Sequence, residues 1–426
     1  MKTLRHYFSQ TGSLLTGRIN SLILTSTTLV IILLSLSITT LNAQGLLPVK
    51  GRVIDGETGK PLPFATVYFN NSTYGATTDE AGEFQFAALP GEYDLIVNFL
   101  SYQPIIYPVQ LSEGDTKTYV FKMSPLEYDL KEISVESTRD EIWYQNFRVF
   151  KEQFLGTSLA ASACEIRNPE VIILDYNPQT KIMQVRARDI LQIENKALGY
   201  RIQYLLDRFE YDLGQGYVYF QGYPLFEEMT GSKTKQKKWA KARRISYNGS
   251  ATHFMKSVID GSVEEEGFEV IEVIKKPNTN KPSAEEVKNA RAKIRLAGTR
   301  GIAIASDSEE MQIIRRSNEP DFIRYSNNKP YPTDSLVVQS GDKYRLYFPH
   351  LLQVRYTKEA SEQSFTRGLK RLGFQESTLS LTGDTTEVLS NGILADPLAV
   401  LFEGYMGWEK IGNMLPVDYR PSERGE

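Results

Sequence analysis

Residues 65–69 read ATVYF and residues 93–99 read YDLIVNF, and these two stretches decide the fold of the N-terminal part of the chain. In both stretches apolar side chains recur at every second position, which gathers them on one face of an extended strand. Phe69 and Val97 lie on such faces, and Phe84 takes the same place in a third strand. The alternation therefore predicts strands that each bury one face.

Turn residues separate these strands at short intervals between positions 49 and 124. Residues 79–82 read DEAG, which fits a type I turn with Asp first and Gly last. This turn predicts that residues 76–78 and 84–86 pair as a hairpin. Short strands that are broken by frequent turns are typical of a small all-β sandwich.

The same region resembles the carboxypeptidase regulatory-like module, a family with a transthyretin-like sandwich of about seven strands. One departure is Ser101-Tyr102, where a Gly-Tyr pair is commoner. The resemblance implies that residues 46–124 form this sandwich and have an extracytoplasmic accessory role, without chemistry of their own. The segments that carry it are GRVID at 51–55, GKPLPFATV at 59–67, GATTD at 75–79, GEF at 82–84 and SY at 101–102.

Members of this family accompany zinc carboxypeptidases or precede the plug of TonB-dependent receptors, and the sequence argues against both architectures here. A zinc carboxypeptidase needs a His and a Glu three residues apart and a distant second His. Neither His253 nor His350 has a glutamate three residues further on. Only 286 residues follow position 140, too few for a plug and a barrel of about 22 strands.

The composition narrows the function further. The chain has 426 residues, with 49 Lys and Arg against 52 Asp and Glu, so its net charge is −3. This length suffices for two or three domains, and the charge gives no general attraction for nucleic acid. The single cysteine, Cys164, excludes an intramolecular disulfide and a Cys-rich zinc site.

Residues 1–43 have the pattern of a secretory signal peptide. Basic residues precede an uncharged run at residues 19–41, and Ala43 offers a small residue before the expected cut. We expect the mature chain to begin at Gln44 and the protein to lie in the periplasm or at the outer-membrane surface of a Gram-negative bacterium. The alternative is an uncleaved anchor, because the uncharged run is long enough to span a bilayer of roughly 30 Å.

Residues 125–140 form a linker strand that leads to a second module, residues 141–426. Segment 129–135 resembles the one that follows the sandwich in TonB-dependent receptors and would be either a pairing strand for a partner or an ordinary interdomain strand. The second module contains CEIRNP at 164–169, ENKALGY at 194–200, YNGS at 247–250 with HF at 253–254, and GWEK at 407–410 with LP at 415–416. By these segments it resembles an uncharacterised module of secreted Gram-negative envelope proteins, which implies a boundary near 140 and no known activity.

Periodicity predicts a mixed α+β fold for this second module. Aromatic residues at helical spacing predict a helix over residues 143–154, and Ser283 begins a capping box that opens another helix. Residues 170–176 and 181–190 should form a hairpin, and residues 405–414 a short closing helix.

A basic stretch offers one candidate site. Seven cations fall within residues 233–244, around Trp239 and without an acidic residue. They would bind phosphate, an anionic polysaccharide or a lipid headgroup, or they would form the solvated face of a helix that glutamates at positions 264–272 partly neutralise. The seven are Lys233, Lys235, Lys237, Lys238, Lys241, Arg243 and Arg244.

Cys164 and His253 are a second candidate, as the thiol and base of a hydrolase. This chemistry needs the imidazole within hydrogen-bond reach of the sulfur, and nothing in the sequence brings the two together. Acidic residues could be paired as acid and base, but comparably spaced carboxylates occur in most proteins. They are either Asp307, Glu309 and Glu310 or Asp384 and Glu387.

The sequence thus predicts a mainly β chain with α+β character, in which a seven-stranded transthyretin-like sandwich precedes a larger mixed α+β domain. We expect an exported, non-enzymatic envelope protein that binds a protein or glycan partner, with no cofactor, metal, catalytic residue or nucleic acid. Membrane association would use residues 233–244 or an uncleaved anchor. The alternative function is a hydrolase housed in residues 141–426 that uses Cys164 and His253.

Overall fold

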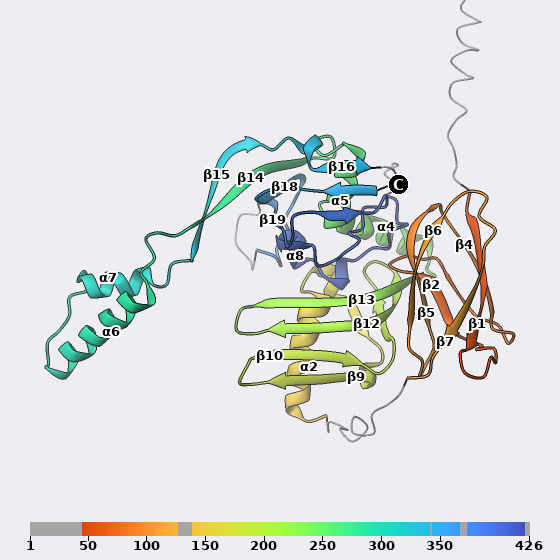
Figure 1. The fold of residues 1–426 in the computed structure, drawn as a ribbon, viewed down its shortest axis with the longest axis horizontal. Coiled ribbons are helices and arrows are strands. Elements are labelled where there is room, and N and C mark those ends of the chain that lie inside the picture. The colour runs from red at the N-terminus through yellow and green to blue at the C-terminus, as the bar shows by residue number, and fades with distance from the viewer. Residues whose placement is uncertain (1–44, 127–138, 341–342, 367–372, 422–426) are drawn as a thin grey trace, which may run out of the picture. The chain divides into compact units, whose positions relative to one another are not determined.

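The computed structural model describes residues 45–126, 139–340, 343–366 and 373–421 (Figure 1). The expected signal peptide and most of the linker strand lie outside the described residues. Strands predominate over helices among the residues that are described.

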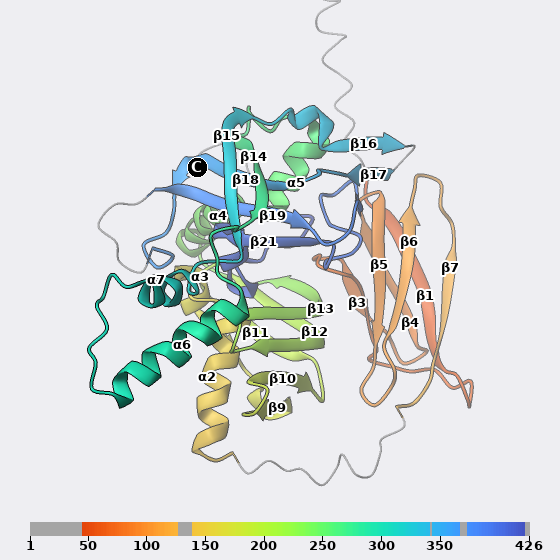
Figure 2. The ribbon, with the colours of Figure 1, turned by 60° about the vertical axis from the view of Figure 1, so that its left-hand side comes forward.

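The N-terminal module is a sandwich of seven strands, as the sequence predicts. One sheet has the order β4-β1-β7 and the other the order β3-β2-β5-β6. Figure 2 shows the strands of both sheets running in nearly the same direction. The strands are β1 (Leu47–Asp55), β2 (Thr66–Phe69), β3 (Gly75–Thr77), β4 (Glu83–Ala88), β5 (Gly91–Asn98), β6 (Ile105–Leu111) and β7 (Thr118–Met123).

The core of this sandwich contains the side chains expected from the alternation. Phe69, Phe84 and Val97 are all buried in one apolar cluster. The ring of Phe69 stacks on Tyr93 at 4.3 Å between centroids. The predicted faces therefore line the sandwich core, but the expectation that each strand buries one face only is wrong for β2 and β5. Tyr68 and Ile96, on the opposite faces, are also buried, and the Tyr68 hydroxyl donates to the carbonyl of Tyr223 in the second module.

The predicted hairpin between residues 76–78 and 84–86 is wrong. The turn itself forms, because the Asp79 carboxylate accepts the backbone N–H groups of Ala81 and Glu83. However, β3 pairs with β2 whereas β4 pairs with β1. The turn carries the chain from one sheet to the other, so that Phe84 enters the shared core from the opposite side.

Two segments that carry the family resemblance meet in the structure. The Tyr102 hydroxyl donates to the Asp55 carboxylate, and this bond, with N–H groups of residues 57 and 58, lowers the pKa of Asp55 to about 2. The preceding residue, Ser101, has φ of +66°. This left-handed conformation favours glycine, which explains why Gly is commoner at that position.

The second module begins with a six-stranded sheet that packs against helix α2 (Glu141–Leu155). Rings of Phe150 and Phe154 on α2 contact Phe209 and Tyr204 of the sheet at about 5 Å, and Figure 1 shows α2 crossing one sheet face. The order is β8-β11-β12-β10-β9, and β13 also pairs with β12. The strands are β8 (Cys164–Ile166), β9 (Ile172–Asn177), β10 (Ile182–Ala187), β11 (Leu191–Asn195), β12 (Tyr200–Asp212) and β13 (Tyr217–Glu228).

A second core lies between helix α5 (Ala251–Asp260) and two further sheets. Phe254 of α5 is fully buried there. The larger sheet has the order β15-β14-β18-β19-β21 and the smaller the order β16-β17-β20. The strands are β14 (Phe268–Pro277), β15 (Phe322–Pro330), β16 (Val337–Ser340), β17 (Lys343–Leu346), β18 (Leu351–Ala360), β19 (Phe374–Leu381), β20 (Thr386–Val388) and β21 (Val400–Gly404).

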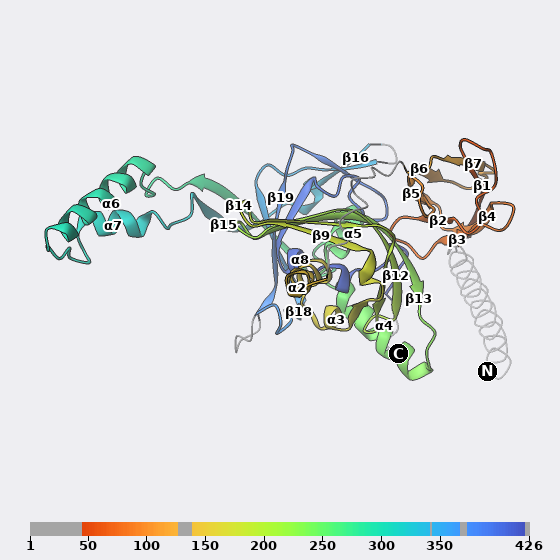
Figure 3. The ribbon, with the colours of Figure 1, turned by 90° about the horizontal axis from the view of Figure 1, so that it is seen from below.

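The remaining helices partly follow the sequence predictions. Ser283 forms the predicted capping box with Glu286 at the start of α6 (Ala284–Thr299), which packs on α7 (Glu309–Arg316). The single helix predicted over residues 405–414 is wrong, because residues 409 and 410 are extended and separate α8 (Tyr405–Trp408) from the 3-10 turn η4 (Ile411–Asn413). Figure 3 shows α8 near α2 and α3 (Leu159–Ser162), beneath the sheet of β12 and β13. Among the described residues, no helix is both long and apolar enough to cross a bilayer.

The loop between β2 and β3, residues 70–74, anchors the sandwich to the second module. Ser72 pairs with Leu225 of β13 in a parallel bridge. The backbone of Asn71 donates to Pro224 and accepts from Val417. The loop is thus hydrogen-bonded to the backbone of the second module. The sandwich is therefore held by these bonds as well as by the linker.

Candidate functional site

A mixed cavity of about 380 Å³ lies beside this anchoring loop. Asn70 and Asn71 bring the sandwich to its wall, and the second module supplies the rest. Its walls combine apolar, aromatic and polar side chains. Among them are Phe220, Gln221, Tyr247, Lys256, Asn391, Glu409, Lys410, Tyr419 and Arg420.

The charged side chains of the mixed cavity are partly buried, and their loss of hydration is not fully offset by a partner of opposite charge. Burial, with the charges of Glu362 and Glu359, raises the pKa of Glu409 well above its usual range. Among the described residues its carboxyl has no hydrogen-bond or ion-pair partner. Burial also lowers the pKa values of Lys410 and Lys256. Such groups gain most from a ligand that supplies an opposite charge or a hydrogen bond.

Two amides at the cavity wall have incomplete hydrogen bonding. The side-chain oxygens of Asn70 and Asn71 are buried and lack a partner among the described residues. Buried polar atoms are rarely left in this state. The wall that the sandwich contributes therefore has polar groups that the protein by itself does not satisfy.

A basic cleft of about 810 Å³ adjoins the mixed cavity. The two share Pro416, Tyr419 and Arg420 as common walls. Six cations and two acidic residues line the cleft, together with Thr73 from the sandwich loop. The cations are Lys237, Lys238, Lys241, Arg243, Arg244 and Arg420, and the acidic residues are Glu228 and Asp418.

Helix α4 (Lys233–Tyr247) carries five of the six cations of the basic cleft. Trp239 is buried and donates its indole N–H to the carbonyl of Lys196 at 3.0 Å. Arg243 donates to the carbonyls of residues 198 and 199 and to Glu228, and its guanidinium lies 3.9 Å from the ring centre of Tyr200. These contacts fix the helix, so its outer cations have a set orientation.

The basic stretch predicted from the sequence is thus a helix with two kinds of cation. Arg243 is held inside the fold, whereas Lys237, Lys238 and Lys241 are exposed and make no hydrogen bond or ion pair with a described residue. Two of the glutamates expected to neutralise the stretch pair elsewhere, because Glu266 lies beside His253 and Glu269 beside Arg355. The sequence identified the basic stretch but could not show which of its cations bind within the fold and which are unpaired.

The structure does not bring Cys164 and His253 together as a catalytic pair. Cys164 lies in the core beneath α2 and donates to the carbonyl of Ala160, and burial raises the pKa of its thiol to about 12. A thiol with this pKa is not a nucleophile at neutral pH. The alternative hydrolase therefore has no support.

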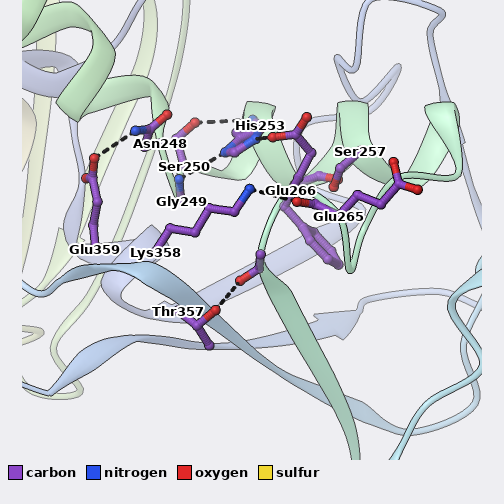
Figure 4. A network of polar contacts seen from close by, with 12 residues as sticks. Asn248, Gly249, Ser250, His253, Ser257, Glu265, Glu266, Thr357, Lys358 and Glu359 are labelled. Carbon is purple, nitrogen blue, oxygen red and sulfur yellow. Dashed lines mark hydrogen bonds and ion pairs between the residues drawn. The ribbon is translucent and has the colours of Figure 1, made fainter.

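His253 instead has a structural role at the start of α5, as Figure 4 shows. Its Nδ1 accepts the backbone N–H of Gly249, and its Nε2 lies 3.2 Å from the Glu266 carboxylate, to which it donates. Both ring nitrogens are therefore occupied. Burial lowers the pKa of His253, although Glu266 opposes the shift.

In each of the two sets of carboxylates considered as an acid and base, one carboxylate forms an ion pair with a lysine. Glu309 and Glu310 begin α7, and Glu310 pairs with Lys293. Glu387 is on β20 and pairs with Lys343. Within the described ranges, no group of three or more His, Cys, Asp or Glu side chains has the geometry of a metal site.

Sequence reasoning missed Glu409, Lys410 and the amides of Asn70 and Asn71. Each is a single polar residue in an ordinary local pattern. Only the meeting of segments near positions 70, 220, 255 and 410 gives them a common environment, and no spacing along the chain signals that meeting.

Comparison with known structures gives only distant likenesses. A candidate carbohydrate binding protein from Bacteroides uniformis is 12% identical, and the alignment covers 37% of this chain and 59% of that one, with a TM-score of 0.16. A candidate membrane-associated protein of unknown function from Bacteroides fragilis is 10% identical, with 84% and 93% covered and a TM-score of 0.16. Scores this low carry no argument about fold or function.

Comparison with protein families is informative for the N-terminal module. No curated protein matches the chain. The family model of the CarboxypepD_reg-like domain matches residues 49–135, in agreement with the seven strands described above and with the resemblance seen in the sequence. This part of the chain is a CarboxypepD_reg-like domain.

Proposed function

We propose that the protein is exported to the cell envelope and binds a glycan there without catalysing a reaction. The mixed cavity is the observation that carries the proposal. A sugar ring presents hydroxyls that need planar polar partners and a C–H face that packs on aromatic rings. Both kinds of group line the cavity, the amides of Gln221 and Asn391 and the rings of Phe220, Tyr247 and Tyr419.

The state of the polar groups supports a binding function. Glu409 has no partner among the described residues, and the oxygens of Asn70 and Asn71 have none either. An interior that served only stability would satisfy such groups or replace them by apolar ones. A ligand with several hydroxyls would satisfy them when it binds.

The proposal also gives the sandwich a part in binding. From the sequence we expect this domain to be only an accessory, yet its anchoring loop supplies Asn70 and Asn71 to the cavity. We therefore assign the ligand to both modules rather than to the second module by itself.

The test is a binding measurement with residues 44–426 against a panel of neutral and acidic polysaccharides by isothermal titration calorimetry. Glu409→Gln and Lys410→Met keep the side-chain shapes and remove the charges, so each should weaken binding at least tenfold. Glu403→Gln is the matched control, because Glu403 pairs with Arg324 and does not line the cavity.

Three results would contradict this function. Unchanged binding in Glu409→Gln and Lys410→Met would show that the ligand binds outside the mixed cavity. A failure to bind any polysaccharide would show that the ligand is not a glycan. Cross-linking in the native envelope that captures a protein at cavity residues would point to a protein partner instead. Export has its own test, since N-terminal sequencing of the mature protein should begin at Gln44.

A further inference from the structure

We infer that the glycan is anionic and that its carboxylate, sulfate or phosphate group binds in the basic cleft while the adjoining sugar occupies the mixed cavity. This inference rests on the proposed function and adds the class of ligand. It starts from the shared walls of the two spaces, Pro416, Tyr419 and Arg420. A ligand in one space can extend past Tyr419 into the other.

The cations of the basic cleft lie on one helix face. Lys237, Lys241 and Arg244 are separated by four and three residues, which places them above one another on α4. All three are exposed, and Lys238 lies beside them at the cleft wall. Neighbouring like charges at this spacing destabilise a helix, and a bound anion would remove that repulsion.

The acidic groups of the cleft do not neutralise this face. Glu228 is paired with Arg243 at 2.7 Å. Asp418 accepts the backbone N–H and the hydroxyl of Thr73. Both acids are thus engaged in holding α4 and the anchoring loop, and the positive charge of Lys237, Lys238, Lys241 and Arg244 remains available.

Because α4 is anchored to the fold, its basic face is preorganised for binding. Trp239 and Arg243 bind the helix to carbonyls of residues 196–199. The cations therefore need little reorganisation of the backbone to meet a ligand, which lowers the cost of binding. Arg420, which donates to the carbonyls of Val417 and Tyr419, closes the cleft from the other side.

The shape of the site favours an anionic chain over a membrane surface. Cations that bind a bilayer lie on a convex or flat face, where several headgroups reach them together. Here they line a cleft, with Thr73 of the sandwich and Tyr419 among its other walls. A single charged group on a narrow polymer can enter such a cleft, whereas a plane of lipids cannot.

The experiment compares ligands that differ only in charge. Polygalacturonate is titrated beside its methyl ester and dextran sulfate beside dextran, each at 50 mM and 300 mM salt, with phosphatidylglycerol vesicles as the membrane probe. We expect one acidic polymer to bind at least tenfold more tightly than its neutral counterpart. Added salt should reduce this preference, because the Debye length falls well below ~10 Å.

The decisive variant replaces Lys237, Lys238 and Lys241 by Gln together. Its matched control replaces Lys288, Arg291 and Arg295 of α6, three exposed cations with the same loss of charge outside the cleft. The first variant should lose the preference for the acidic polymer, and the control should keep it. Both should unfold close to the wild-type temperature, because none of the six side chains has a hydrogen bond or ion pair with a described residue.

The outcomes separate this inference from the proposed function. If the neutral polymer binds as tightly as its acidic counterpart, and Glu409→Gln still weakens binding, the protein binds glycans but the anionic class is wrong. If the cleft variant retains the preference, the anion does not bind in the basic cleft. If only the vesicles bind, the site is a membrane surface site and both proposals fail.

Discussion

The sandwich and the region around the mixed cavity use polar side chains in opposite ways. In the sandwich, the polar residues that the sequence singles out are bonded within the fold: Asp55 accepts from Tyr102, and Asp79 accepts from the N–H groups of its own turn. Around the mixed cavity and basic cleft, Glu409 and Lys237 have no partner among the described residues. The difference indicates that the first region is built for stability and that the second has polar and charged groups available for a ligand.

The largest expected effect is the loss of a buried ring from the sandwich. Phe84 is 4% exposed and stacks near Phe121, so Phe84→Ala should lower the free energy of unfolding by about 3 to 5 kcal/mol. Chemical denaturation with intrinsic fluorescence measures it. Val120→Ala is the control, because Val120 is 60% exposed and its loss should change stability by less than about 0.5 kcal/mol. Equal effects would show that the strand faces are assigned wrongly.

The second prediction compares a bonded cation of helix α4 with an unpaired one. Arg243→Ala removes the donor to the carbonyl of Leu198, one of the two donors to the carbonyl of Gly199, and the partner of Glu228, and it should cost about 2 to 3 kcal/mol. Lys241→Ala on the same helix should cost less than about 0.5 kcal/mol, since Lys241 has no bonded partner among the described residues. Thermal melts of the two variants check this, and similar losses would remove the distinction between structural and available cations.

The third prediction concerns acid stability of the sandwich. The folded pKa of Asp55, about 2, lies below its unfolded value of 3.8, so its contribution is complete above pH 3.8 and is lost as the pH falls toward 2. Tyr102→Phe removes the hydroxyl that is the largest cause of the shift. The Asp55 pKa, followed by NMR of the carboxyl carbon, should rise toward 3.8, and no change would mean that the Tyr102 bond does not form in solution.

The smallest predicted effect is a gain in stability. Ser101 has φ of +66°, a conformation that is strained for an L-residue and easy for glycine. Because the relief of strain outweighs the added freedom of the unfolded chain, Ser101→Gly should stabilise the protein by about 0.5 to 1 kcal/mol. Ser101→Ala serves as the comparison in the same denaturation experiment, and a gain there too would contradict the backbone explanation.

The sequence predictions succeeded where the signal was local. Alternation identified the faces of β2 and β5 that line the sandwich core, and a capping box placed the start of α6. They failed where long-range pairing decides the outcome. The turn at Asp79 was recognised, but local residues do not say whether the strands on either side join one sheet or two.

The candidate site shows the same limit. The basic stretch at residues 233–244 was visible because its charges are contiguous in the chain. The mixed cavity was not, because its walls come from residues near positions 70, 220, 255, 391 and 410. Nor could the sequence separate Arg243 from Lys241, since their different roles depend on which carbonyls lie beside α4.

By itself, the sequence determined the sandwich of residues 47–123 and the helices with clear periodicity, because strand alternation, turn chemistry and helix caps act over a few residues. Tertiary structure decided how the loop at residues 70–74 joins the second module, which cations of α4 remain unpaired and which polar groups share one cavity. These features depend on contacts between segments that are far apart in the chain, by 45 residues for Arg243 and Leu198 and by 345 for Thr73 and Asp418. Burial and hydrogen bonding at such distances follow from packing of the whole chain, and no local pattern encodes them.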